Sequence, residues 1–161
     1  MTLVVPVEQR EENLKLIADA YVDLFEIFLY TGEILYLKSN ETVEWSGHTW
    51  EGYPINLSGY EISTDKLSRP VLKVVNPGGV FSSIFVSGNL EKAKVNRYRV
   101  LRKHIDENKP IYQLCTWILW QVKSITKDYA EFELRNPMDG NNFITPGRQY
   151  LPPEFPTVTL V

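Results

Sequence analysis

The stretch LCTWILWQVKSITKDYAEFELRN, residues 114–136, contains the pattern that decides the fold. Its first half is rich in β-branched and aromatic residues, which are typical of strands. Its second half alternates, with Ala130, Phe132 and Leu134 predicted to face inward and Tyr129, Glu131 and Glu133 outward. On the first half, one side is predicted to carry Leu114, Thr116, Ile118, Trp120 and Val122. The short link at residues 127–128 predicts a long antiparallel hairpin.

Further strand patterns lie upstream of this hairpin. Residues 22–30 are apolar on both faces, as in a central strand, and a glycine-containing turn leads to a second apolar run at 34–38. The stretch SGHTW, residues 46–50, predicts another turn between two strands. Residues 69–76 alternate and end in the chain break Asn-Pro-Gly-Gly. Residues 80–88 fit either a short helix or an apolar segment.

One amphipathic helix is predicted near the N-terminus. Along residues 8–20 and the residue that follows, Leu14, Ile17, Ala18 and Tyr21 recur at helical spacing. Short strands with turn signals and one helix predict a mainly β fold: an antiparallel β-barrel or sandwich with an N-terminal amphipathic helix and an extended, proline-rich C-terminal arm. The predicted organisation is a helical arm over 1–21, a β-rich domain over 22–136 and the extended arm over 137–161.

The composition narrows the classes of function. The chain has 161 residues, 43% of them hydrophobic and 23% charged, which is the range of one globular domain. The formal net charge of −3 provides no bulk attraction to nucleic acid. The single cysteine, Cys115, excludes an internal disulfide framework. We also expect no membrane span and no signal peptide, because no apolar run is long enough and the first residues lack a basic region.

The sequence shows no recognisable catalytic or metal-binding motif. His48, His104 and Cys115 are far apart in sequence and show no metal-ligand spacing, and a strand position favours Cys115 as a small buried hydrophobe. Carboxylate pairs such as Glu131 and Glu133 are expected at the solvated surface. The basic run over 92–103 alternates with apolar residues, which favours a solvated or inter-subunit face over nucleic-acid binding. We therefore expect no enzyme, no metal and no cofactor.

Large aromatic side chains are abundant for a chain without a catalytic set. Some must form the core, and aromatic residues are also enriched in protein–protein interfaces, which favours an interaction or assembly module. The aromatic residues in question are Trp45, Trp50, Tyr53, Tyr60, Trp117, Trp120 and Tyr150.

From Trp45 onward the sequence resembles the minor tail protein L family of lambda-type siphophages. The resemblance rests on the order and spacing of short motifs from about Tyr21 to the end of the chain. These include WSGHTW, GYP, the segment SRPVLKVVN, the basic run with its Val-x-Arg, and PGR near the C-terminus. The residues that carry it, and that we treat as interface candidates, are Trp45, Gly47, Tyr53, Pro54, Gly59, Arg69, Pro70, Asn76, Arg97, Pro146, Gly147 and Arg148.

The resemblance implies a structural virion protein of the tail tip or baseplate, assembled in the host cytoplasm. Its implied partners are the distal tail ring protein and the central hub or fibre protein. It would form a trimeric or hexameric ring with no direct nucleic-acid readout and no membrane contact. Both termini are candidates for reaching neighbouring subunits, although each could instead cover its own domain. The alternative function is a carbohydrate- or receptor-binding module of the tail tip.

The resemblance also bears on cofactors. Lambda-type members continue past the Pro-Gly-Arg segment into a cysteine-rich module that holds an iron–sulfur cluster. The present sequence stops at Val161, and Cys115 matches none of the ligand positions of that module. We therefore expect a short version of the family without a cluster.

Overall fold

The computed structural model describes residues 6–13, 20–59, 69–88, 90 and 92–138. The elements in chain order are α1 (Val7–Asn13), β1 (Tyr21–Phe28), β2 (Ile34–Lys38), β3 (Val43–Trp45), β4 (His48–Gly52), β5 (Ile55–Ser58), β6 (Val71–Val75), the 3-10 turn η1 (Pro77–Gly79), α2 (Val80–Val86), β7 (Lys94–Leu101), α3 (Arg102–Asp106), β8 (Tyr112–Ile125) and β9 (Tyr129–Arg135). The prediction of a mainly β fold with an N-terminal helix is confirmed. The proline-rich arm lies outside the described residues from residue 139 onward.

The strands of the described residues form one nine-stranded sheet with the order β3-β4-β2-β1-β7-β8-β9-β6-β5. Neighbouring strands are antiparallel except β2 and β4, which are parallel through Leu37↔Glu51 and Lys38↔Gly52. The predicted hairpins β1–β2, β3–β4 and β8–β9 are all present. Because the pairing is that of a single mixed sheet, the choice between barrel and sandwich stays a prediction.

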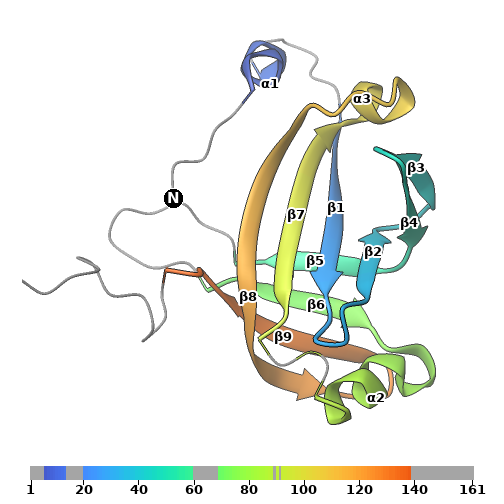
Figure 1. Cartoon of the computed structure of the whole chain (residues 1–161), viewed down its shortest axis with the longest axis vertical. Helices are drawn as coiled ribbons and strands as arrows, with labels where there is room; N and C mark the ends of the chain where they lie inside the picture. Colours follow the sequence, from blue (N-terminus) through green and yellow to red (C-terminus); the bar gives the residue numbers. More distant parts are fainter. Residues whose placement is uncertain (1–5, 14–19, 60–68, 89, 91, 139–161) are drawn as a thin grey trace, which may run out of the picture.

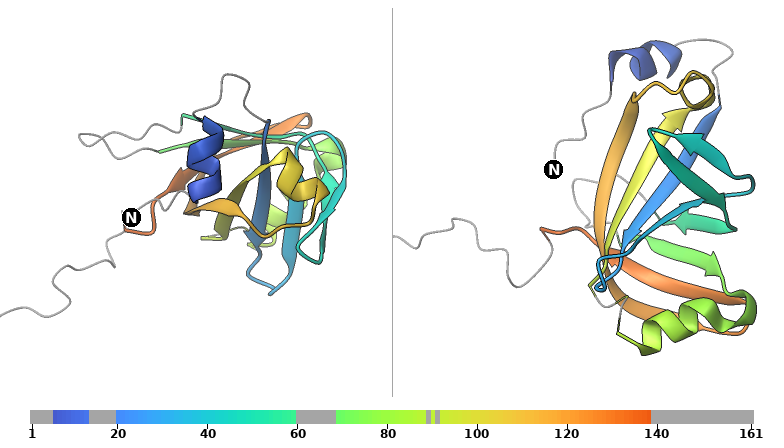
Figure 2. Two further views of the ribbon diagram at one scale, coloured as in Figure 1. Left: turned by 90° about the horizontal axis from the view of Figure 1, so that it is seen from above. Right: turned by 45° about the vertical axis from the view of Figure 1, so that its right-hand side comes forward.

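Strand β8 joins two parts of this sheet. Its first half pairs with β7 from Tyr112 to Ile118, and its second half pairs with β9 from Ile118 to Ile125. In Figure 1, β1, β7 and the first part of β8 stand upright, while β5, β6 and β9 lie across them, and Figure 2 shows the same arrangement from the side. The sheet therefore folds over on itself at β8.

Two register shifts in β8 change which side chains face inward. They lie between Leu119 and Gln121 and between Val122 and Ser124. Each extra residue reverses the facing of the residues that follow and bends the strand. Val122, predicted on the same side as Trp120, packs instead against the core that contains Leu119. That part of the alternation prediction was wrong, because a bulge is not visible in the hydrophobic pattern.

The main core fills the space between the two parts of the sheet. It also confirms the inward positions predicted for β9. The buried residues that form it include Phe25, Ile27, Leu37, Ile55, Leu72, Val74, Val95, Cys115, Trp117, Leu119, Ala130, Phe132 and Leu134. A second cluster, of Leu24, Trp45, Trp50, Val100 and Ile105, lies where the β3–β4 hairpin and α3 cover the other face of β1 and β7.

The predicted outward position of Glu133 needs a correction. Glu133 does not face the main core, yet it is buried rather than solvated. Gln121 donates a hydrogen bond to Glu133 Oε2 at 3.4 Å, and Arg135 Nε lies 3.5 Å from its Oε1. Neighbouring polar side chains on β8 and β9 therefore cover a carboxylate that alternation alone places at the surface.

Helix α1 lies over the end of the sheet, beside α3 (Figure 2). The buried side chain of Gln9 donates a hydrogen bond from Nε2 to the backbone oxygen of Arg99 at 3.1 Å. Glu8 Oε2 lies 3.1 Å from Nε2 of the buried His104 on α3. Of the predicted helical stripe, residues 14–19 lie outside the described residues, and Tyr21 begins β1 instead.

Asn76 joins the end of β6 to helix α2, the segment that the sequence left undecided. Its side chain is fully buried, and its Oδ1 accepts a hydrogen bond from Phe81 N at 2.9 Å. Its Nδ2 donates to Ser82 Oγ and to Thr126 O, both at 2.8 Å. Its backbone N–H donates to Asp128 O, also at 2.8 Å. One side chain thus fixes the start of α2 against the β8–β9 turn.

Gly52 is held against the turn that follows β2. Its N–H donates to Thr42 Oγ1 at 3.0 Å. A Cβ at Gly52 would overlap the backbone oxygen of Asn40 and would lie 2.9 Å from Glu41 C and Thr42 N. Only a residue without a side chain fits this approach of β4 to the turn.

We predict that Asn76→Asp lowers the free energy of unfolding by about 1–3 kcal/mol, because a carboxylate oxygen would replace the Nδ2 that donates to Thr126 O. The measurement is urea unfolding at neutral pH. Asn56→Asp, at an exposed position of β5, is the matched control and is expected to change stability by less than ~0.5 kcal/mol. Equal effects of the two substitutions would contradict a central role for Asn76.

Gly52→Ala is expected to lower the free energy of unfolding by about 1–3 kcal/mol, because backbone atoms would have to move to admit the methyl group. Thermal unfolding measures this loss. Glu51→Ala, at the exposed neighbouring residue, should stay close to the parent protein. A Gly52→Ala variant as stable as Glu51→Ala would show that the turn can shift freely.

Candidate functional site

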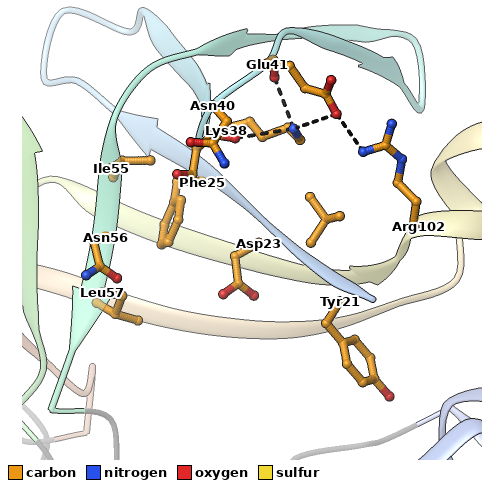
Figure 3. A pocket seen from close by; sticks show the side chains of 12 residues that line it. Tyr21, Asp23, Phe25, Lys38, Asn40, Glu41, Ile55, Asn56, Leu57 and Arg102 are labelled. Carbon is orange, nitrogen blue, oxygen red and sulfur yellow. Dashed lines mark hydrogen bonds and ion pairs between the residues drawn. The ribbon is translucent and has the colours of Figure 1, made fainter. Parts of the chain in front are cut away.

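A polar pocket of about 720 Å³ lies between β1 and β5. Figure 3 shows Ile55, Asn56 and Leu57 along β5 on one side of it, and Tyr21 and Asp23 of β1 on the other. The segment 38–41 and Arg102 of α3 complete the wall. The pocket lies where β2 has ended: pairing between β1 and β2 stops at Leu24↔Lys38, so β1 has no β2 partner beside Tyr21 to Asp23.

A charged group closes one end of this pocket. The buried Lys38 donates from Nζ to the backbone oxygens of Ser39 at 3.3 Å and Glu41 at 3.1 Å. Glu41 Oε1 lies 3.7 Å from the same Nζ and accepts a hydrogen bond from Arg102 at 2.6 Å (Figure 3). The hydrogen bond from Arg102 is the main reason that the pKa of Glu41 lies below its usual range, and nearby Lys38 adds to this.

Asp23 and Arg97 form a second charged pair on the inner face of the sheet. Arg97 donates to Asp23 Oδ2 at 2.7 Å, and its side chain is 11% exposed. Arg97 pairs in register with Phe25 and Cys115, both buried in the main core. The expectation of a solvated or inter-subunit face for the basic run therefore does not describe this arginine, which lies mostly within its own chain.

The opposite face of the sheet carries a polar row across four strands. Tyr36, Glu26, Asn96 and Thr116 are consecutive register partners on β2, β1, β7 and β8. Asn96 Nδ2 donates to Glu26 Oε2 at 2.8 Å, and Thr116 Oγ1 donates to Asn96 Oδ1 at 2.9 Å. Tyr98 donates to the same Glu26 oxygen at 2.8 Å. Burial, followed by this hydrogen bond, raises the pKa of Tyr98 far above its usual value.

Aromatic side chains cover one end of this row. Trp45 contacts Trp50, Tyr98 and Tyr112 with ring centroids 5.7–6.1 Å apart. Its Nε1 donates to the backbone oxygen of Lys109 at 3.0 Å. Tyr36 stacks on His48 with centroids 4.5 Å apart. Of the seven aromatic residues singled out in the sequence, Trp45, Trp50 and Trp117 are buried, Tyr53 is half-buried, Trp120 is 42% exposed, and Tyr60 and Tyr150 lie outside the described residues.

The interface candidates fall at separate places in the fold. Within the described residues, the buried ones are Trp45, Pro70 and Asn76, and the exposed ones are Gly47, Pro54, Gly59 and Arg69. Gly47, at a φ of 78°, makes the β3–β4 turn. The half-buried Tyr53 packs against Phe81. Pro146, Gly147 and Arg148 lie outside the described residues. The structure does not gather the described candidates into one site, and their interface role stays a prediction.

Sequence reasoning missed Glu26 and Lys38. A signal was present for Glu26, because a carboxylate within the two-sided apolar stretch 22–30 requires buried partners. Lys38 gave no such signal, because it is the last residue of a short strand, where a solvated lysine is ordinary.

In the described part of the chain, no group of three His, Cys, Asp or Glu residues could hold a metal ion, and Cys115 is a buried free thiol. No helix in that part is long and apolar enough to cross a membrane.

We predict that Glu41→Gln destabilises the protein more than Glu131→Gln, which breaks the more ordinary pair with Lys73 at 3.0 Å. The first change removes a carboxylate from the buried Lys38 as well as from Arg102. Because folding lowers the pKa of Glu41, its contribution exists at neutral pH and is lost as acid protonates it. Urea midpoints measured from pH 7 downward should therefore converge for parent and Glu41→Gln, and a constant gap would contradict this role.

A chain in a solved structure of the virion of a native gene transfer agent particle has a similar fold, with a TM-score of 0.67 at 12% identity over 91% of this chain. The match covers 50% of that chain, so the present chain spans about half its length. No curated protein matches. The family model for phage minor tail protein L matches residues 25–155, which is most of the chain, and the chain therefore belongs to the phage minor tail protein L family.

Proposed function

We propose that this chain is a ring component of the tail tip, linking the tail tube or distal tail ring to the central hub and its host-recognition fibre. The observation that carries the proposal is the family match over residues 25–155. Membership makes the chain a structural phage tail protein, and the fold similarity to a virion chain agrees with this class of function. The finer position, at the tail tip, comes from the resemblance that the sequence motifs carry.

The described surface suits assembly better than chemistry. The buried polar groups around Glu26 form hydrogen bonds between neighbouring strands. The charged side chains at the polar pocket form ion pairs with one another, so they are not directed at a ligand in the pocket. Exposed apolar side chains lie at separate places: Tyr30 at the β1–β2 turn, Val86 on α2, and Leu114 and Trp120 on β8. A closed ring needs two different surfaces on each subunit, and these separated side chains supply candidates for both.

The carbohydrate- or receptor-binding alternative finds less support. Sugar binding through exposed tryptophans would require open indole faces. Trp45, Trp50 and Trp117 are buried, and the guanidinium of Arg135 lies 4.0 Å from the ring centroid of Trp120. Saturable binding of purified host glycans by the isolated protein would revive this alternative.

The direct test is to locate the chain in purified particles. Mass spectrometry of virions should detect the protein in a fixed ratio to the hub protein, and averaged electron-microscopy images should place a three-fold or six-fold ring of this fold beside the hub. Immunogold labelling with an antibody against the exposed β1–β2 turn provides an independent position, with a capsid antibody as control. Absence from purified virions, or labelling at the capsid, would contradict the proposal.

A further inference from the structure

We propose that the polar pocket beside β5 is a docking slot for a strand, and that its occupant is the C-terminal segment Thr157–Val161 of a neighbouring copy of this chain. The inference deepens the proposed ring assembly and rests on it. It places one contact between subunits at the open edge of β5, where the backbone can pair with a further strand.

The edge of β5 supplies the template. β5 is the last strand of the sheet order, with β6 as its neighbour. Val75 N–H donates to Pro54 O at 3.0 Å, and hydrogen-bonded pairs alternate along an antiparallel ladder. The backbone groups of Asn56 and Ser58 therefore point toward β6, and those of Ile55 and Leu57 point out of the sheet. No backbone hydrogen bond joins β5 to β1 among the described residues.

The pocket gives an added strand both space and walls. It runs along Ile55 to Leu57 and is bounded on the far side by the Tyr21 end of β1 (Figure 3). Its charged groups pair with one another. Lys38 and Arg102 pair with Glu41, and Asp23 pairs with Arg97 through Oδ2, while the buried Oδ1 of Asp23 has no hydrogen-bond partner. An uncharged extended segment fits such a slot, because it adds main-chain hydrogen bonds without leaving a buried charge unpaired.

The sequence Thr157-Val-Thr-Leu-Val161 has the required character. It combines β-branched residues with one leucine and contains no charge, proline or glycine. In an extended segment Val158 and Leu160 would lie on one face and the threonines on the other. That alternation matches β5, where Ile55 and Leu57 are buried or half-buried and Asn56 and Ser58 are exposed.

The length of the linker favours a neighbouring copy over the chain's own slot. β9 lies two strand spacings from β5, about 10 Å, because β6 separates them: Ser58 pairs with Val71 and Val71 with Glu133. Residues 139–156 contain Pro146, Pro152, Pro153 and Pro156. A proline-rich chain of this length spans roughly 55 Å when extended. This reach is enough to cross to a neighbouring subunit and is several times what a return to the chain's own slot requires.

Disulfide trapping in the full-length protein tests the slot and its occupant together. Asn56→Cys and Thr159→Cys are made in separate preparations that keep the buried Cys115, and the two are mixed and oxidised at the concentration at which the oligomer forms. We expect the yield of disulfide-linked dimer to be about tenfold or more higher than in a control mixture of Lys123→Cys with Thr159→Cys. The reason is that a docked arm holds the two thiols at high effective concentration. Adding Leu160→Pro to the arm should abolish the link, and Leu160→Val should retain it.

Two results would overturn the inference. One is a mixture with no more linked dimer than the control. The other is an intrachain link in the double variant Asn56→Cys/Thr159→Cys, with none in the mixture, which would place the arm in its own slot. Two further measurements separate this inference from the proposed function. Rings seen by electron microscopy of the same samples, without the link, would refute the strand exchange alone. A linked dimer, together with absence of the chain from purified virions by mass spectrometry, would refute the tail-tip role alone.

Discussion

The bend in β8 is the constraint on which the rest of the structure depends. The first of its two bulges brings Leu119 and Val122 to the same core, although a regular strand would place them on opposite faces, and the second does the same for Val122 and Ile125. Because one half of β8 pairs with β7 and the other with β9, the bend turns one sheet into two facing parts with the main core between them. The same fold-over leaves the edge of β5 opposite the end of β1, and the polar pocket is the space between them.

Local patterns explain which parts of this fold were predictable. The hairpins followed from short turns between apolar runs, and the inward set Ala130, Phe132 and Leu134 followed from alternation. The parallel contact of β2 with β4 and the pairing of β1 with β7 join segments with no local signal. The polar pocket escaped prediction for the same reason, because its walls come from β1, β5 and α3.

The residues that carry the family resemblance include several that hold corners of the fold. Asn76 ties β6 to α2 and the β8–β9 turn, and Trp45 ties the β3–β4 hairpin to the chain after α3. Pro70 accepts a hydrogen bond from Leu134 N at 2.8 Å, which fixes the start of β6 beside β9. A motif of this kind identifies the framework of a tail protein. Other residues of the same motif set, Gly47, Pro54, Gly59 and Arg69, are exposed, and their role in an interface stays a prediction.

The pairing of β1 with β7 also sets the order in which the chain can fold. Phe28 meets Lys94 and Tyr21 meets Leu101, so the N-terminal hairpin has to wait for a strand more than sixty residues later in synthesis. Until then the apolar inner face of β1 has no cover, and topologies dominated by such distant pairings fold in about milliseconds to seconds. Glu26 receives its hydrogen bonds from Asn96 and Tyr98, which both lie on β7, so the buried site of this carboxylate is complete only once that distant strand has been made.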